Sequence, residues 1–232
     1  MQRKAEFPHR LNFDSVAMEL IRQILDVILH LQTHLNDLLT NYGPWFYALL
    51  FAVIFCETGL VITPFLPGDS LLFAVGALAA DAKSGLNIWV CAGAIAAAAF
   101  LGDNVNYWVG KLLGKTLVRR FPRLVKPEHL EKTHRFFEKY GPKTIVMARF
   151  VPIVRTFTPF VAGLGTMPYP RFIAMSLFAT GLWVGLILPC GYFFGNLPFV
   201  KKHFELIVLG IIGVSLLPMV IEWWRSRSNT AK

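Results

Sequence analysis

Long apolar stretches separated by short polar segments run through the chain, and their lengths predict membrane helices. Residues 86–110 and 171–195 are each long enough to cross a bilayer as one helix, because a span needs about 20 residues. Residues 204–224 form a third candidate span. It ends in two tryptophans followed by arginines, which is typical of an aromatic belt and a cytoplasmic anchor.

A further apolar stretch, residues 44–80, is interrupted in its middle by the letters TPFLPGDS. Its first limb, from Trp45 to Ile62, is barely long enough to cross, and its second, from Leu71 to Ala80, is far too short. The prolines and the glycine of the interruption stop a helix. The pattern predicts a re-entrant hairpin, whose freed backbone groups must be satisfied by protein or water.

Residues 144–167 repeat this broken design. The stretch is apolar but contains Arg149, Pro152, Arg155 and Pro159, followed by two glycines and another proline. Prolines at this spacing interrupt a helix, so the stretch predicts a second re-entrant element.

The N-terminal 40 residues have a different character. Residues 1–13 predict a disordered tail and show no apolar core or cleavage site of a signal peptide, so the first membrane segments should direct insertion. Asp14 and Ser15 are N-cap residues before an amphipathic helix over residues 14–40. This helix lies either at the membrane interface or inside the bundle.

Positive charge is concentrated in the polar connection over residues 111–143, which holds ten Lys/Arg against three Asp/Glu. The positive-inside rule places this loop in the cytoplasm, together with the tail over residues 226–232. Within the loop, Pro127 to Tyr140 predicts a helix with a proline at its start and Gly141 as its stop. Basic residues near the N-terminus place that end inside as well, which requires the 14–40 helix to cross.

The two halves of the membrane domain, residues 14–225, resemble each other. Tyr42-Gly43-Pro44 recurs as Tyr140-Gly141-Pro142, and in that register Glu57-Thr58 falls on Arg155-Thr156. Each half has a broken hairpin followed by a span. We therefore predict an all-α polytopic membrane protein with an inverted repeat of a re-entrant helical hairpin plus a transmembrane helix, and an extra C-terminal span. The alternative is a coincidence between apolar, glycine-rich stretches.

Composition excludes several classes of protein. The chain is 55% hydrophobic and only 16% charged, whereas soluble domains carry about 25% charged residues. The net charge of +9 lies next to apolar segments, so it indicates membrane orientation and not nucleic-acid binding. The three cysteines are far apart in apolar runs, and we expect no disulfide, no metal site and no cofactor.

Five ionisable residues lie in or beside the apolar segments: Glu57, Asp69, Asp103, Arg149 and Arg155. A charge at the centre of a bilayer costs about 2.5 kcal/mol or more. Charged groups in such places need partners or water. Their default interpretation is a functional site.

The carboxylates have two possible roles each. An apolar environment disfavours ionised Glu57, so it can take up and release a proton, or it can form a structural ion pair with either arginine. Asp69, followed by Ser70 at a predicted helix start, is a helix N-cap or a second proton carrier. Asp103, with Asn106 near it, is expected to make a polar contact between helices.

The two arginines flank Pro152, and this break lets Arg149 and Arg155 converge. Guanidinium groups stay charged and bind phosphate through two parallel hydrogen bonds, so both are candidate ligands for a lipid phosphate. The alternative is that they pair with Glu57 and Asp69, which would leave no free positive charge.

Four sequence blocks, FCETGLVITPFLPGDSLLF, GDNVNYWVGKLLG, ARFVPIVRTFTPFVAG and GYFFG, resemble the DedA family of membrane proteins, also known for its VTT-type domain. The resemblance covers about residues 16–224. It implies two opposed re-entrant hairpins, dependence on the proton motive force and a role in envelope homeostasis in the bacterial inner membrane. It also implies that the essential acidic and basic positions are Glu57, Asp69, Arg149 and Arg155.

These observations favour a proton-coupled transporter that flips a lipid phosphate, and the resemblance implies undecaprenyl phosphate or a phospholipid as that lipid. Glu57 and Asp69 would carry protons, Arg149 and Arg155 would bind the phosphate, and the helix start at Ser70 would add a positive dipole. The alternative is a small-ion/proton antiporter without a lipid substrate. An enzyme is not expected, because all six histidines lie in polar or amphipathic stretches. A chaperone for membrane proteins would not need these charges, and the oligomeric state stays open.

Overall fold

The computed structural model describes residues 31–59, 68–120, 127–165, 167–204, 206–211 and 213. These residues contain helices and turns, and no strand is found in this part of the chain. The predictions for the N-terminal tail, the first half of the 14–40 helix, most of the 204–224 span and the C-terminal tail lie outside the described residues.

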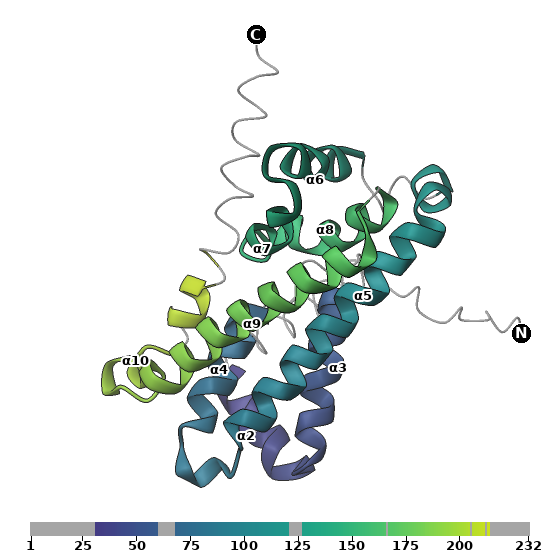
Figure 1. Ribbon diagram of the computed structural model, residues 1–232. Helices are drawn as coiled ribbons and strands as arrows, with labels where there is room; N and C mark the ends of the chain where they lie inside the picture. The colour runs from purple at the N-terminus through teal and green to yellow at the C-terminus, as the bar shows by residue number, and fades with distance from the viewer. Residues whose placement is uncertain are drawn as a thin grey trace, which may run out of the picture.

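Two long helices form the centre of the molecule. They are α5 (Ile88–Arg120) and α9 (Tyr169–Phe194), which pack against each other (Figure 1). Residues 88–114 and 169–194 are long and apolar enough to cross a membrane. The bounds of α9 agree with the predicted 171–195 span. The helix of the first span continues beyond residue 110, where we expected the polar connection to begin, and reaches Arg120 through good helix formers such as Lys, Leu and Arg.

The first hairpin consists of α3 (Trp45–Gly59) and α4 (Gly68–Ala79), and it is preceded by α2 (Leu31–Tyr42). The prediction of two short apolar limbs is confirmed, with residues 60–67 between them not described. The second limb begins at Gly68, not at Leu71 as the sequence predicted. Asp69 and Ser70 are therefore part of the first helical turn.

The second hairpin consists of α7 (Thr144–Ala148) and α8 (Pro152–Leu164). The predicted break is confirmed, and it spans the three residues before Pro152, which opens α8 where its missing N–H costs nothing. The helix α6 (Pro127–Tyr140) precedes this hairpin and has the predicted bounds. A short helix that the sequence did not predict, α10 (Pro198–Lys202), follows α9.

The two hairpins pack on the long helices in a reciprocal way. The first limb of each hairpin packs on the long helix of its own half, α3 on α5 and α7 on α9. The second limb packs on the long helix of the other half, α4 on α9 and α8 on α5. In Figure 1 the first hairpin lies toward one end of the α5–α9 pair and the second toward the opposite end. An inverted repeat predicts this arrangement.

Backbone contact at glycines brings α4 against α9. A Cβ atom added at Gly76 would lie 2.3 Å from the Leu188 carbonyl oxygen, and one added at Gly191 would lie 2.1 Å from the Phe73 carbonyl oxygen. Distances this short leave no room for any side chain. The two glycines therefore allow the helix backbones to touch, as small residues do in membrane bundles.

The contact between α8 and α5 repeats the same design. A Cβ atom at Gly163 would lie 1.9 Å from the Tyr107 carbonyl oxygen, and one at Gly110 would lie 2.1 Å from the Phe160 carbonyl oxygen. Each second limb thus contributes a Phe-x-x-Gly sequence, Phe73 to Gly76 or Phe160 to Gly163. The same kind of glycine contact therefore joins the second limb to the long helix of the other half in both hairpins.

The register predicted for the repeat needs correction. Gly43 and Gly141 both follow a helix and have left-handed φ angles of 51° and 59°, so the two Tyr-Gly-Pro motifs are equivalent turns. The first limb has 15 residues in one half and 5 in the other, so the register changes along the hairpin. Glu57 in the last turn of α3 corresponds in position to the end of α7, and not to Arg155.

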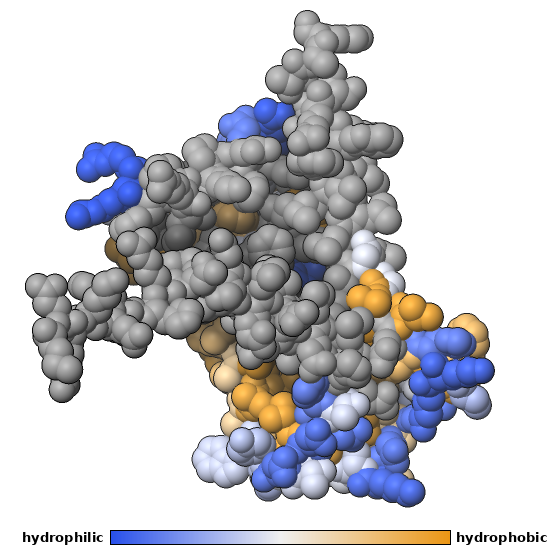
Figure 2. All heavy atoms as spheres, turned by 180° about the vertical axis from the view of Figure 1, so that it is seen from behind, coloured by the Kyte–Doolittle hydropathy of each residue, from blue (hydrophilic) through white to orange (hydrophobic). Residues whose placement is uncertain are grey.

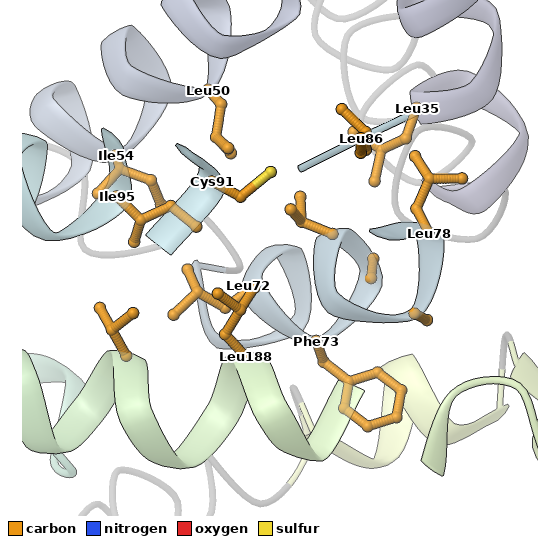
Figure 3. Close-up of a cluster of buried hydrophobic side chains, with 14 of the residues drawn as sticks. Leu35, Leu50, Ile54, Leu72, Phe73, Leu78, Leu86, Cys91, Ile95 and Leu188 are labelled. Atoms are coloured by element: carbon orange, nitrogen blue, oxygen red, sulfur yellow. The ribbon is translucent and has the colours of Figure 1, made fainter. Parts of the chain in front are cut away.

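The largest apolar core lies between α3, α4, α5 and α9. Ile54 of α3 lies beside Ile95 of α5, and Leu72 of α4 lies beside Leu188 of α9 (Figure 3). Many large apolar side chains point outward instead, among them Trp89, which is 81% exposed. In Figure 2 apolar surface borders a band of polar side chains at one end of the molecule. Exposed apolar surface of this extent suits contact with lipid.

Candidate functional site

The five predicted charged residues meet in the interior, where the ends of the two hairpins come together between α5 and α9. Glu57, Asp103 and Arg149 are buried, with at most 3% of each residue exposed. Asp69 and Arg155 are partly buried. The expectation that the broken helices bring these charges together is confirmed by their contacts.

Arg155, near the start of α8, forms ion pairs with both carboxylates of the first hairpin. Its Nη2 donates to Glu57 Oε1, and its Nη1 donates to Asp69 Oδ1 at 3.0 Å. One arginine of the second hairpin therefore bridges the end of α3 and the start of α4. The interpretation of Glu57 as an ion-pair partner is correct for Arg155.

The Glu57 carboxylate also lies against the first turn of α4. A Cβ atom at Gly68 would lie 2.1 Å from Glu57 Oε2, so a larger residue here would displace the Glu57 carboxylate. The helix N-terminus carries partial positive charge, which favours a carboxylate here. Ser70, in the same turn, is fully buried.

Asp69 was a candidate N-cap, and this alternative is wrong. It is the second residue of α4, so it lies inside the first turn and not at the cap position. Its carboxylate accepts hydrogen bonds from Arg155 on α8 and from Trp183 on α9. Asp69 thus connects its own half of the molecule to the other half.

Arg149, directly after α7, forms a separate ion pair. Its Nη1 donates to Asp103 Oδ2 on α5 at 2.6 Å, and the same oxygen accepts from Ser176 Oγ on α9 at 2.7 Å. The predicted pairing of Arg149 with Glu57 or Asp69 is not what the structure shows. Asp103 makes the predicted contact between helices, but as the buried ionic partner of Arg149.

Trp183, in the middle of α9, is a site residue that the sequence analysis missed. Its indole Nε1 donates to Asp69 Oδ1 at 2.8 Å. The Cζ atoms of Arg149 and Arg155 lie 5.2 and 5.3 Å from the centroid of its ring. Both distances fit cation–π contacts, which favour Arg over Trp. A lone tryptophan far from the ends of a predicted span was the signal available in the sequence.

Asn106 on α5 ties the two hairpins together. Its amide nitrogen donates to the Thr156 carbonyl of α8 at 2.8 Å and lies 3.5 Å from the Thr58 carbonyl of α3. The freed carbonyl groups of a broken helix need such donors in a membrane. The predicted supporting role of Asn106 fits these contacts.

The site as a whole holds three carboxylates and two guanidinium groups. It contains no grouping of three His, Cys, Asp or Glu side chains that could hold a metal ion, and neither does the rest of the described chain. The site therefore contains ion pairs in the interior of the protein. The pairs of Arg155 with Glu57 and Asp69 are partly accessible to solvent.

Comparison with known proteins identifies the relatives of this chain. The model of the VTT domain matches residues 66–193, more than half of the chain. Protein DedA of Escherichia coli K12 is 50% identical over 93% of this chain and 99% of its own length. An uncharacterized membrane protein of Mycobacterium leprae is 46% identical over 78% of this chain and 82% of its own length.

The inner membrane protein YqjA of Escherichia coli K12 is 32% identical over 88% of this chain and 90% of its own length. No solved structure matches the chain. The chain is a membrane protein that belongs to the DedA family.

Proposed function

We propose that this protein is a bacterial inner-membrane transporter that uses the proton motive force to flip a lipid phosphate, supporting envelope homeostasis. The observation that carries the proposal is Arg155 of the second hairpin, held between Glu57 and Asp69 of the first. Its partners are protons and a lipid phosphate, either undecaprenyl phosphate or a phospholipid. We propose no enzymatic activity.

The charge balance of the site supports coupling to protons. Glu57, Asp69 and Asp103 contribute three negative charges when ionised, and Arg149 and Arg155 contribute two positive charges. The excess negative charge lies in a region of low dielectric, where unbalanced charge is costly. Uptake of one proton by the Glu57–Asp69 pair makes the site neutral. Protonation of the Glu57–Asp69 pair would therefore change the ion pairs that these two carboxylates form with Arg155.

The same contacts explain how a phosphate enters the cycle. Protonation of Glu57 or Asp69 weakens the hold on Arg155 and releases a guanidinium that can bind phosphate through two hydrogen bonds. Deprotonation restores the ion pairs and displaces the phosphate. Proton and phosphate thus compete for the same arginine, while the lipid tail stays in the surrounding bilayer.

The topology of the proposal follows the charge of the loops. The two hairpins are re-entrant and enter from opposite faces of the membrane. The basic segment around α6 and the C-terminus lie in the cytoplasm, according to the positive-inside rule. The location in the inner membrane is supported by the relative YqjA, which is an inner membrane protein.

The test is flipping of labelled undecaprenyl phosphate and labelled phospholipid in proteoliposomes with an imposed pH gradient. We expect Arg149→Ala, Arg155→Gln and Glu57→Gln to lower the rate at least about tenfold, since a lost hydrogen bond to a charged group is worth ~1.5–3 kcal/mol. Arg135→Gln is the control, because Arg135 is exposed and pairs only along α6. Equal rates in wild type and Arg155→Gln would refute the proposal, and equal rates in wild type and Arg149→Ala would refute the role of Arg149.

The second candidate is a small-ion/proton antiporter. It is favoured by the ion pairs of Arg155, since two carboxylates flank the one guanidinium and balance its positive charge in this arrangement. Dissipation of a pH gradient by Na⁺ or K⁺ in vesicles, equally fast with and without an added lipid phosphate, would support the antiporter over the flippase.

A further inference from the structure

One face of α9 directs three buried polar side chains toward the charged site. Ser176, Thr180 and Trp183 are spaced four and three residues apart, which places them on one side of a helix. Each is at most 1% exposed. Ser176 is bonded to Asp103 and Trp183 to Asp69. Thr180 Oγ1, between them, has no hydrogen-bond partner within the described residues.

The Arg149 guanidinium lies opposite this same stretch of α9. At one end it bonds the Asp103 oxygen that Ser176 also contacts. At the other end its Cζ is 5.2 Å from the ring of Trp183. Because these contacts lie at the two ends of the stretch from Ser176 to Trp183, we expect the guanidinium to lie near the turn of α9 that carries Thr180.

Two of the three nitrogen atoms of this guanidinium make no hydrogen bond to the described part of the protein. Nη1 is bonded to Asp103, but Nε and Nη2 of Arg149 have no hydrogen-bond partner among the described residues, although the residue is only 3% exposed. A buried donor without a partner destabilises the fold, so it needs a reason to persist. Nε–H and Nη2–H point the same way from one edge, which matches two oxygens of a phosphate.

We propose that the Nε–Nη2 edge of Arg149 and the hydroxyl of Thr180 form a binding subsite for the oxygens of a phosphate group. The proposal rests on the proposed function and refines it. Asp103 and Ser176 hold Arg149 from its other edge, so this subsite stays formed while Arg155 changes partners. Three donors suit a terminal phosphate with three free oxygens. The subsite therefore favours a lipid phosphate monoester over a diester, which offers only two.

The experiment measures binding to the purified full-length protein in detergent by calorimetry. The probes are dioctanoyl phosphatidic acid as a monoester, dioctanoyl phosphatidylglycerol as a diester, and inorganic phosphate as a free ion. We expect Thr180→Val to weaken binding of the monoester about tenfold, as for one lost hydrogen bond to a charged group. Thr180→Ser keeps the hydroxyl and should bind within about threefold of wild type.

Thr158→Val is the matched control. Thr158 is an equally buried threonine, but its hydroxyl is bonded to the Val154 carbonyl of its own helix. It should bind the monoester as wild type does. Arg149→Lys provides a second route if Thr180→Val does not fold, because lysine keeps the charge for Asp103 but lacks the two-donor edge. We expect at least a tenfold loss for it as well.

The outcomes separate this inference from the proposed function. Wild-type binding of the monoester that is unchanged in Thr180→Val overturns the subsite and leaves the flippase in place. Inorganic phosphate that binds as tightly as phosphatidic acid overturns the assignment to a lipid. Wild-type protein that binds phosphatidylglycerol as tightly as phosphatidic acid overturns the preference for a monoester. Wild-type protein that binds none of the probes overturns the subsite, whereas the flipping assay with undecaprenyl phosphate tests the proposed function separately.

Discussion

The two hairpins have the same architecture but opposite chemistry. In each, the first limb packs on its own long helix and the second packs on the other long helix through a Phe-x-x-Gly contact. The first hairpin carries two carboxylates, Glu57 and Asp69, and the second carries two guanidinium groups, Arg149 and Arg155. The backbone repeat thus provides symmetry, and the side chains provide the charge difference that holds the halves together.

The hairpins differ in length as well as charge. The first limb has 15 residues in α3 and 5 in α7, whereas the second limbs α4 and α8 have 12 and 13. The parts that cross to the other half are therefore matched, and the parts that stay within a half are not. The second limbs are therefore the matched parts that connect the two halves, and the predictions below test how alike they are.

The largest effect is expected from removal of the cation that joins the hairpins. Arg155→Leu leaves Glu57 and Asp69 without their shared partner, and breaking such a buried pair costs about 3–5 kcal/mol of unfolding free energy. Loss of transport should accompany this loss of stability. Denaturant unfolding in detergent measures it, with Arg135→Leu on the exposed face of α6 as the control, expected to change stability by less than ~1 kcal/mol. Equal stability of the two variants would show that Arg155 does not join the halves.

The glycine contacts should give the next largest effect, and an equal one in both hairpins. A Cβ atom at Gly76 or Gly163 would lie about 2 Å from a carbonyl oxygen of the opposite helix, so either Gly→Ala change must push two backbones apart. We expect each to lower the unfolding free energy by about 1–3 kcal/mol. Gly181→Ala on α9 has nothing within 4 Å and should be neutral or stabilising. Unequal losses at the two sites would break the symmetry of the second limbs.

Several features of the fold could be predicted because they depend on local sequence alone. The proline at 152 placed the break before α8, and a proline at its start with Gly141 as its stop placed α6 from Pro127 to Tyr140. The continuation of α5 beyond residue 110 was missed, since charged helix formers are compatible with either a loop or a helix.

The partners within the site could not be predicted in the same way. That Arg149 pairs with Asp103 depends on how α7 is rotated against α5, and neither segment contains that information. Trp183 was missed because an aromatic residue in an apolar span looks like any other core residue until its neighbours are known. The predicted register failed because it assumed two first limbs of equal length.

Trp183 allows a test of whether both arginines are held by one ring. Trp183→Phe keeps an aromatic face for Arg149 and Arg155 but loses the indole N–H that donates a hydrogen bond to Asp69. We expect a loss of about 1.5–2 kcal/mol in unfolding free energy, as for a hydrogen bond to a charged group. Trp183→Leu removes the ring too and should lose about 1 kcal/mol more. If the two variants unfold at the same denaturant concentration, the ring contributes nothing beyond its N–H.

The smallest effect is expected at Asn106, where it should distinguish the hairpins. Its amide has a 2.8 Å hydrogen bond to the Thr156 carbonyl of α8 but only a 3.5 Å contact with the Thr58 carbonyl of α3. Asn106→Ala should therefore cost about 1 kcal/mol and raise amide hydrogen exchange mainly in α8. Asn106→Asp has the same shape without the donor and should act at least as strongly. An equal rise in amide hydrogen exchange in α3 and α8 would mean that Asn106 supports both hairpins equally. The second limb α8 would then not be its main partner.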